Sequence, residues 1–156
     1  MRKSDQPVRV RKPLPKSGLK ATKHKMEENQ LDWGPVIRWF GHVPLFHDAE
    51  VVSIELRRDP IPSIVRLFAF RMNSDIDERG YYRLDLHALV TFSLSGIGRV
   101  ELDDWNHQNA LQSLEIKKVD DAYQLDMVGA YGVHGLIAAK SIAVQVEPWL
   151  PDLAVK

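Results

Sequence analysis

His47, Asp48 and Glu50 are the residues whose types and spacing come closest to a chemical site. Imidazole and carboxylate groups bind metal ions and carry protons in general acid–base catalysis. They directly precede an alternating strand, so Asp48 and Glu50 would share one face and His47 would take the other. No second histidine stands at helical spacing, and His42 lies across Pro44. Three interpretations stay open: Asp48 bonds to free backbone N–H groups at the entry to the sheet, the group recognises a partner, or it binds metal or does catalysis.

Trp105 lies in a polar, acidic stretch, between Asp103 and Asp104 on one side and Asn106 and His107 on the other. Aromatic anchors carry much of the energy of protein interfaces, so this pattern is typical of a binding surface. The alternative is that Trp105 folds back over the edge of the core. The acidic residues we expect to face solvent and to be available to a partner include Asp48, Glu50, Glu55, Asp103 and Asp104.

Other candidate motifs fail on their spacing. Asp75-x-Asp77-x-x-Gly80 lacks the further oxygen ligands of a calcium loop. Gly96-Ile97-Gly98 lacks the third glycine of a dinucleotide fingerprint and opens a strand where that motif opens a helix. The chain has no cysteine, which excludes disulfides, thiolate metal sites and cysteine nucleophiles. We therefore expect no cofactor, no metal ion and no catalytic residue.

The chain has 156 residues, of which 44% are hydrophobic, and this predicts one globular domain. No apolar run approaches the roughly 20 residues that span a bilayer. The basic N-terminus has no apolar segment of the kind that a secretory signal needs. These features favour a cytoplasmic protein that does not contact the membrane.

Charge is distributed unevenly, although the formal net charge is zero. Residues 1–25 hold nine Lys or Arg and one acid, which leaves 12 basic and 20 acidic residues in 26–156. We predict that residues 1–30 are a disordered basic tail. Three accounts of it stay open: a flexible arm that touches nucleic acid or an acidic surface, a tail without a role, or a start codon placed upstream of a true start at Met26. Residues 31–156 are predicted to form a single β-rich domain.

The hydrophobic pattern predicts one helix followed by strands. A stripe made by Trp33, Val36, Ile37 and Phe40, with Asp32 as N-cap and Gly41 as the end, predicts a helix over 31–41. Alternation predicts strands at 50–57, 63–72, 81–94, 98–103, 111–119, 122–128 and 135–146. In the first strand Val52, Ile54 and Leu56 should face inward; in the third, the alternate residues from Tyr82 to Leu94. We expect a bulge near His87-Ala88 and a chain reversal at Ser95-Gly96. The predicted fold class is mainly β: an antiparallel sandwich or curled sheet of about seven strands with one short N-terminal helix.

The run Trp39-Phe40-Gly41-x-x-Pro44-x-Phe46-His47-Asp48-Ala49-Glu50-Val51 resembles the signature of the Immunity protein 50 family. The similarity continues through Asn106-His107-Gln108-Asn109 and covers about residues 31–148. Members of this family are the antidote halves of bacterial polymorphic toxin systems. We expect Trp39, Phe40 and Phe46 to form a plug between helix and sheet; an aromatic ligand pocket is the alternative.

The resemblance implies an intracellular immunity protein that occludes a cognate toxin domain and performs no chemistry. An acidic surface would suit a basic toxin, of which a nuclease is one example. Two other hypotheses stay open. One is a small-molecule-binding or enzymatic sandwich, in which His42, His47 or His134 would converge on the carboxylates near Asp48. The other is a nucleic-acid binder that uses the basic arm.

Overall fold

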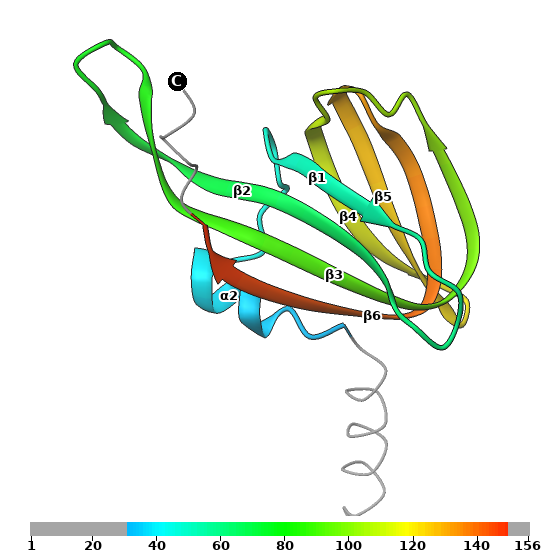
Figure 1. The fold of residues 1–156 in the computed structure, drawn as a ribbon. Helices are drawn as coiled ribbons and strands as arrows, with labels where there is room; N and C mark the ends of the chain where they lie inside the picture. The colour runs from blue at the N-terminus through cyan, green and yellow to red at the C-terminus, as the bar shows by residue number, and fades with distance from the viewer. Residues whose placement is uncertain (1–30, 150–156) are drawn as a thin grey trace, which may run out of the picture. The chain divides into compact units, whose positions relative to one another are not determined.

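The computed structural model describes residues 31–149, and these residues form one antiparallel sheet with a short helix before it (Figure 1). The elements are α2 (Gly34–Phe40), β1 (Glu50–Glu55), β2 (Ser63–Ile76), β3 (Tyr82–Asp103), β4 (Ala110–Val119), β5 (Ala122–Tyr131) and β6 (His134–Pro148). The predicted fold class is therefore confirmed, with six strands in place of about seven. The predictions for the basic tail and the start at Met26 lie outside the described residues.

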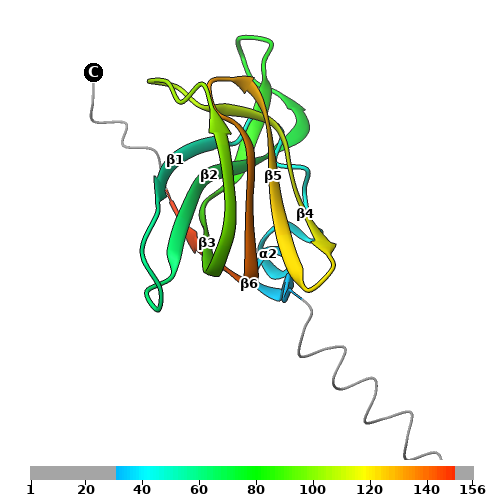
Figure 2. The ribbon, with the colours of Figure 1, turned by 90° about the vertical axis from the view of Figure 1, so that its right-hand side faces the viewer.

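The strands follow the order β1-β2-β3-β6-β5-β4 and close into a barrel through contact between β1 and β4 (Figures 1 and 2). Their inward side chains make one apolar core, because successive side chains of a strand point to opposite faces. Its fully buried members include Val65, Leu67, Val90, Phe92, Leu111, Leu125 and Ile137. The core holds residues from all six strands and from α2.

Helix α2 is shorter than the predicted helix, and its N-cap lies one residue after the expected Asp32. Trp33 is the N-cap, and the Asp32 carboxylate accepts a hydrogen bond from the Gly34 N–H (2.8 Å). Gly41 ends the helix as predicted, with φ of 82° and its N–H bonded to the Ile37 carbonyl. The prediction that Ile37 faces the core is wrong, since its side chain is exposed. With seven residues α2 cannot traverse a bilayer, and the described part of the chain holds no other helix that would.

A bulge in β1 overturns the predicted inward position of Val52, whereas Ile54 packs against the core as predicted. Leu56, just after the strand, is exposed. Val51 pairs with Leu67 and Ser53 pairs with Arg66, so Val52 is an extra residue. The side-chain alternation therefore shifts by one position there. Val51 is buried (2% exposed) and Val52 is exposed (45%), which is the reverse of the expected order.

The predicted reversal at Ser95-Gly96 does not occur, because the strands expected at 81–94 and 98–103 are one strand, β3. Its ladder with β6 runs from Ala88 to Asp103 with a single irregularity between Ile97 and Arg99. Gly96 has φ of 68°, so its freedom serves a distortion inside the strand and no turn. This continuity accounts for the missing seventh strand.

The bulge expected near His87-Ala88 is confirmed. β3 advances three residues from Asp85 to Ala88 while β2 advances two from Ala69 to Arg71, and Leu86 has φ of 50°. The prediction that alternate side chains from Tyr82 to Leu94 face inward therefore holds only after the bulge, because Tyr82 and Leu84 are exposed. They belong to the end of the β2–β3 hairpin, which projects past the rest of the sheet (Figure 1).

Candidate functional site

Residues 41–49, here called the signature loop, connect α2 to β1 and hold Phe46 at the centre of an aromatic cluster. Phe46 is 3% exposed, and its ring centroid lies 6.5 Å from that of Trp33 and 6.2 Å from that of Phe92. Its φ of 58° is uncommon for a bulky residue and is held by this packing. Phe46 thus forms a plug between the start of the helix and the inner face of the sheet, with Trp33 and Phe92 as its ring partners in place of the predicted Trp39 and Phe40.

Trp39 links the helix to the bulge of β3. Its indole N–H donates a hydrogen bond of 2.8 Å to the Leu86 carbonyl, on the residue whose positive φ marks the bulge. A bulge interrupts the regular ladder of a sheet and leaves backbone groups in need of other partners. Trp39 supplies one such partner.

The backbone of the signature loop closes the sheet. Asp48 N–H donates to the Leu111 carbonyl (2.9 Å), and Leu111 N–H donates to the Ala49 carbonyl (2.8 Å). Further along, Leu114 N–H donates to the Leu45 carbonyl (2.9 Å). These bonds place the loop along the edge of β4, so the signature loop joins the two ends of the sheet.

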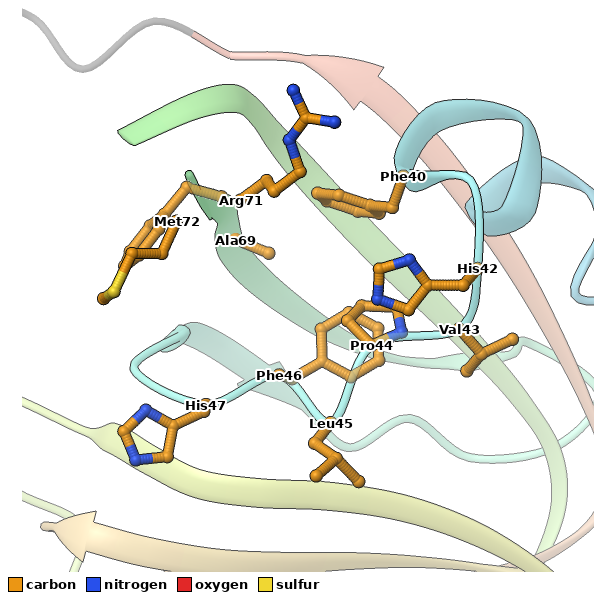
Figure 3. A pocket seen from close by; sticks show the side chains of 11 residues that line it. Phe40, His42, Val43, Pro44, Leu45, Phe46, His47, Ala69, Arg71 and Met72 are labelled. Carbon is orange, nitrogen blue, oxygen red and sulfur yellow. The ribbon is translucent and has the colours of Figure 1, made fainter. Parts of the chain in front are cut away.

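A cavity of about 450 Å³ lies between the signature loop and β2 (Figure 3). Its lining includes Phe40, His42, Phe46, His47, Ala69 and Arg71, and it contains no carboxylate. Arg71 makes two bonds to Asp85 (2.8 and 2.7 Å), which hold the pKa of the Asp85 carboxyl below its usual value. The guanidinium is therefore already paired.

The arrangement that the enzymatic hypothesis requires is not found among residues 31–149. His47 Nδ1 lies 2.9 Å from the carboxylate of its neighbour Asp48, and both are exposed. His134 is elsewhere, with its Nδ1 3.6 Å from Asp104. Within this range no group of three or more His, Cys, Asp or Glu side chains could hold a metal ion. The contact recorded for the Asp48 carboxylate is His47, whereas the structural interpretation expected backbone N–H groups.

Glu50 and Glu55 differ in their surroundings. Glu50 is half-buried and stands opposite Ala110 at the junction of β1 and β4. Glu55 is paired with Arg66 and Arg57, which hold the pKa of its carboxyl below the usual value. The charge of Glu55 is thus balanced within the chain.

Trp105 lies in the connection between β3 and β4, and its side chain is 54% exposed. It lines a groove of about 340 Å³ together with Ile54 of β1, Leu56 just after that strand, Leu102, Asp103, Asp104 and Val133. Trp105 therefore covers part of the core edge and still presents half of its surface to solvent. The structure brings together Asp103, Asp104 and Trp105, near the end of β1, whereas Asp48 and Glu50 lie at its beginning.

Asn109 positions this connection and was not singled out as a site residue from the sequence. Its buried side-chain oxygen accepts hydrogen bonds from the N–H groups of Asn106 (3.0 Å) and Val133 (2.9 Å). Its amide group donates to the Asn106 carbonyl (2.8 Å). Asn109 therefore ties the Trp105 connection to the turn between β5 and β6. An asparagine in a polar stretch gives no signal of this role, because Val133 is 24 residues away.

These features define a small antiparallel β protein in which an aromatic residue of the signature loop packs between the helix and the sheet. The backbone of that loop closes the sheet. The family model for Immunity protein 50 matches residues 34–148. The chain belongs to this family of immunity proteins, as the resemblance of the signature implied. No curated protein and no solved structure shows significant similarity to it.

Proposed function

We propose that the chain neutralises a cognate toxin domain, in the cytoplasm of the bacterium that makes both, by binding and occluding it. The family supports a role as an immunity protein. The observation that carries the location is the half-exposed Trp105, which lines the groove together with Asp103 and Asp104. Trp105, Asp103, Asp104 and the groove beside them are here called the Trp105 surface.

Packing supports Trp105 as an anchor. Hot-spot residues combine a large apolar area with a fixed position, because a side chain that is already ordered loses little entropy on binding. Leu102 and Val133 border the groove that Trp105 lines, and Asn109 fixes its connection. Its remaining exposed half is available to a partner.

Charge supports a basic partner. Residues 31–149 carry seventeen acidic and eleven basic side chains. No basic side chain lines the groove within this range, whereas Asp103 and Asp104 do. An acidic surface speeds the encounter with a basic protein and helps to orient it. Occlusion through such a surface needs no catalytic step by the antidote.

The test is co-purification of the full chain with the C-terminal domain of the toxin encoded beside it, together with rescue of growth. We expect a stable complex, and we expect Trp105→Ala to weaken it by about 2 kcal/mol or more. Tyr81→Ala is the matched control, because Tyr81 is an exposed aromatic on the projecting hairpin. A complex that survives Trp105→Ala and is lost with Tyr81→Ala would move the binding surface to the hairpin. No complex and no rescue would overturn the proposed function itself.

A further inference from the structure

The sheet is closed along only part of β1. β3 and β6 pair from Ala88 to Asp103, whereas β1 and β4 share one register pair, Glu50 with Ala110. The last backbone bond across this junction is from Val51 N–H to the Asn109 carbonyl (2.9 Å). Beyond it, the partners of β1 recorded for residues 31–149 lie only in β2, ending with Glu55 opposite Ile64. Among the described residues, 52–56 therefore have one edge without a neighbouring strand; this opening is here called the seam.

The register indicates which backbone groups face the seam. Alternate residues of an antiparallel strand direct their N–H and C=O groups to the same side. The backbone N–H of Val51 bonds toward β4. The backbone groups of Leu67, which stands opposite Val51, therefore point away from β1, and those of the adjacent Arg66 point toward β1. Ser53 stands opposite Arg66 and thus bonds toward β2. The N–H and C=O of Ile54, the next residue, point into the seam.

Apolar side chains line the same opening. The groove is lined by Ile54 of β1 and by Leu56 just after it, together with Leu102, Trp105 and Val133. Leu56 is 54% exposed, as Trp105 is. A strand laid against β1 would pair with Ile54 and cover these side chains at once.

The two free edges beside the junction differ in how well they are protected against pairing with another chain. Past Leu114, the edge of β4 away from β5 carries Lys118 and Lys117, of which Lys117 lies 3.5 Å from the carboxylates of Glu115 and Asp126. Lysine on an edge discourages pairing with another chain. Residues 52–56 hold no lysine and no proline, and their single charge, Glu55, is paired with Arg66 and Arg57. The seam can therefore accept an added strand, whereas the lysines on the β4 edge oppose one.

We propose that the seam receives an extended segment of the toxin, which adds to β1 as a strand and completes the sheet. This rests on the proposed function and specifies its binding mode. Five residues of strand span about 17 Å, enough for a segment of about five residues. Alternate side chains of the segment would enter the groove. Asp103 and Asp104 favour a lysine or arginine in it, which is the chemistry of a basic toxin.

Hydrogen exchange of backbone amides in the complex tests this mode, because strand pairing would give the seam amide of β1 a hydrogen-bond partner. With the full chain and the C-terminal domain of the neighbouring toxin, we expect exchange at Ile54 to slow by about tenfold or more. An unchanged Ile54 amide in a complex that does form would overturn the strand addition and leave the proposed function standing. If no complex forms, both fail. Protection in the free chain that grows with its concentration would overturn the proposal in favour of a second copy.

A matched pair of substitutions tests the groove. Leu56→Lys places a charge at the seam, which opposes both the apolar contact and a basic segment, and should weaken binding by about tenfold or more. Val119→Lys makes the same change at an exposed apolar residue at the end of β4 and should leave affinity unchanged. Both variants should keep the melting temperature of the parent. Equal affinity in the two variants would contradict the proposal.

Discussion

The signature loop and the Trp105 surface lie at opposite ends of β1 and are built in opposite ways. In the signature loop, Phe46 is buried and the backbone bonds to β4. At the Trp105 surface, half of Trp105 is exposed and the nearby edge of β1 has no neighbouring strand in the described residues. One end closes the sheet, and the other leaves it open.

This difference separates what makes the family recognisable from what would make a partner bind. The signature places large aromatics and a residue with positive φ where the chain must turn into the sheet. Such positions admit few residue types, because packing and backbone conformation both constrain them. The Trp105 surface is constrained through Asn109 only at its base. Substitutions at the two ends should therefore affect different measurements.

The largest effect should come from Phe46→Ala. Removing a buried phenylalanine leaves a cavity and typically costs about 3–5 kcal/mol of unfolding free energy. Denaturant unfolding of the free chain measures it. Leu45→Ala is the control, because Leu45 is the adjacent residue and is 64% exposed; we expect a change within about 0.5 kcal/mol. Similar losses in the two variants would contradict the plug.

Asn109→Ala should have an intermediate effect, and it should lower both the stability of the free chain and its affinity for the toxin. It leaves the Val133 N–H without its acceptor and releases the Asn106 carbonyl, at a cost of about 1–3 kcal/mol. Because the Trp105 connection loses its tie, toxin affinity should fall together with stability. Gln108→Ala, at the exposed neighbour, should change neither. A stable Asn109→Ala variant with full affinity would show that the surface does not depend on this asparagine.

Much of the fold could be predicted from the sequence because side-chain alternation and turn residues are local signals. The pattern from Ala88 to Leu94 identified a core strand, and Gly41 identified the end of the helix. The errors came from single inserted residues. Val52 shifts the phase of β1, and Gly96 distorts β3 without reversing it. An extra residue resembles its neighbours in sequence, and only the partner strand reveals it.

The candidate sites likewise divide into features that local sequence signals predict and features that depend on residues far apart in the sequence. Local polarity around Trp105 left open whether it is exposed or folds back over the core edge. The structure has it half exposed, with Asp103 and Asp104 beside it. The seam could not be predicted, because it depends on which strands meet and where their pairing ends. The same holds for Glu55, which was expected to be available to a partner and is held by Arg66 and Arg57. Residues far apart in sequence decide both.

Neutralising the acids beside Trp105 should change binding more gently than removing the anchor. Asp103→Asn with Asp104→Asn removes two charges from an exposed site, so we expect a severalfold slower association and a weaker dependence on salt. The unfolding free energy should stay within about 0.5 kcal/mol. Asp120→Asn with Asp121→Asn, in the turn between β4 and β5, removes the same charge elsewhere. Equal slowing in both double variants would assign the effect to net charge alone.

The smallest expected effect concerns the protonation of Glu55, and it decides whether this acid belongs to the binding surface. Arg66, followed by Arg57, lowers the pKa of the Glu55 carboxyl in the folded chain. Any stability from these pairs is present above the unfolded pKa and is lost as the pH falls through the folded pKa. Carboxyl titration by NMR should show the Glu55 midpoint rising toward its usual value in Arg66→Gln and staying unchanged in Arg99→Gln, since Arg99 pairs with Glu101. If the Glu55 midpoint is the same in Arg66→Gln as in the parent, the carboxylate is free. It would then join Asp103 and Asp104 as a contact for a basic partner.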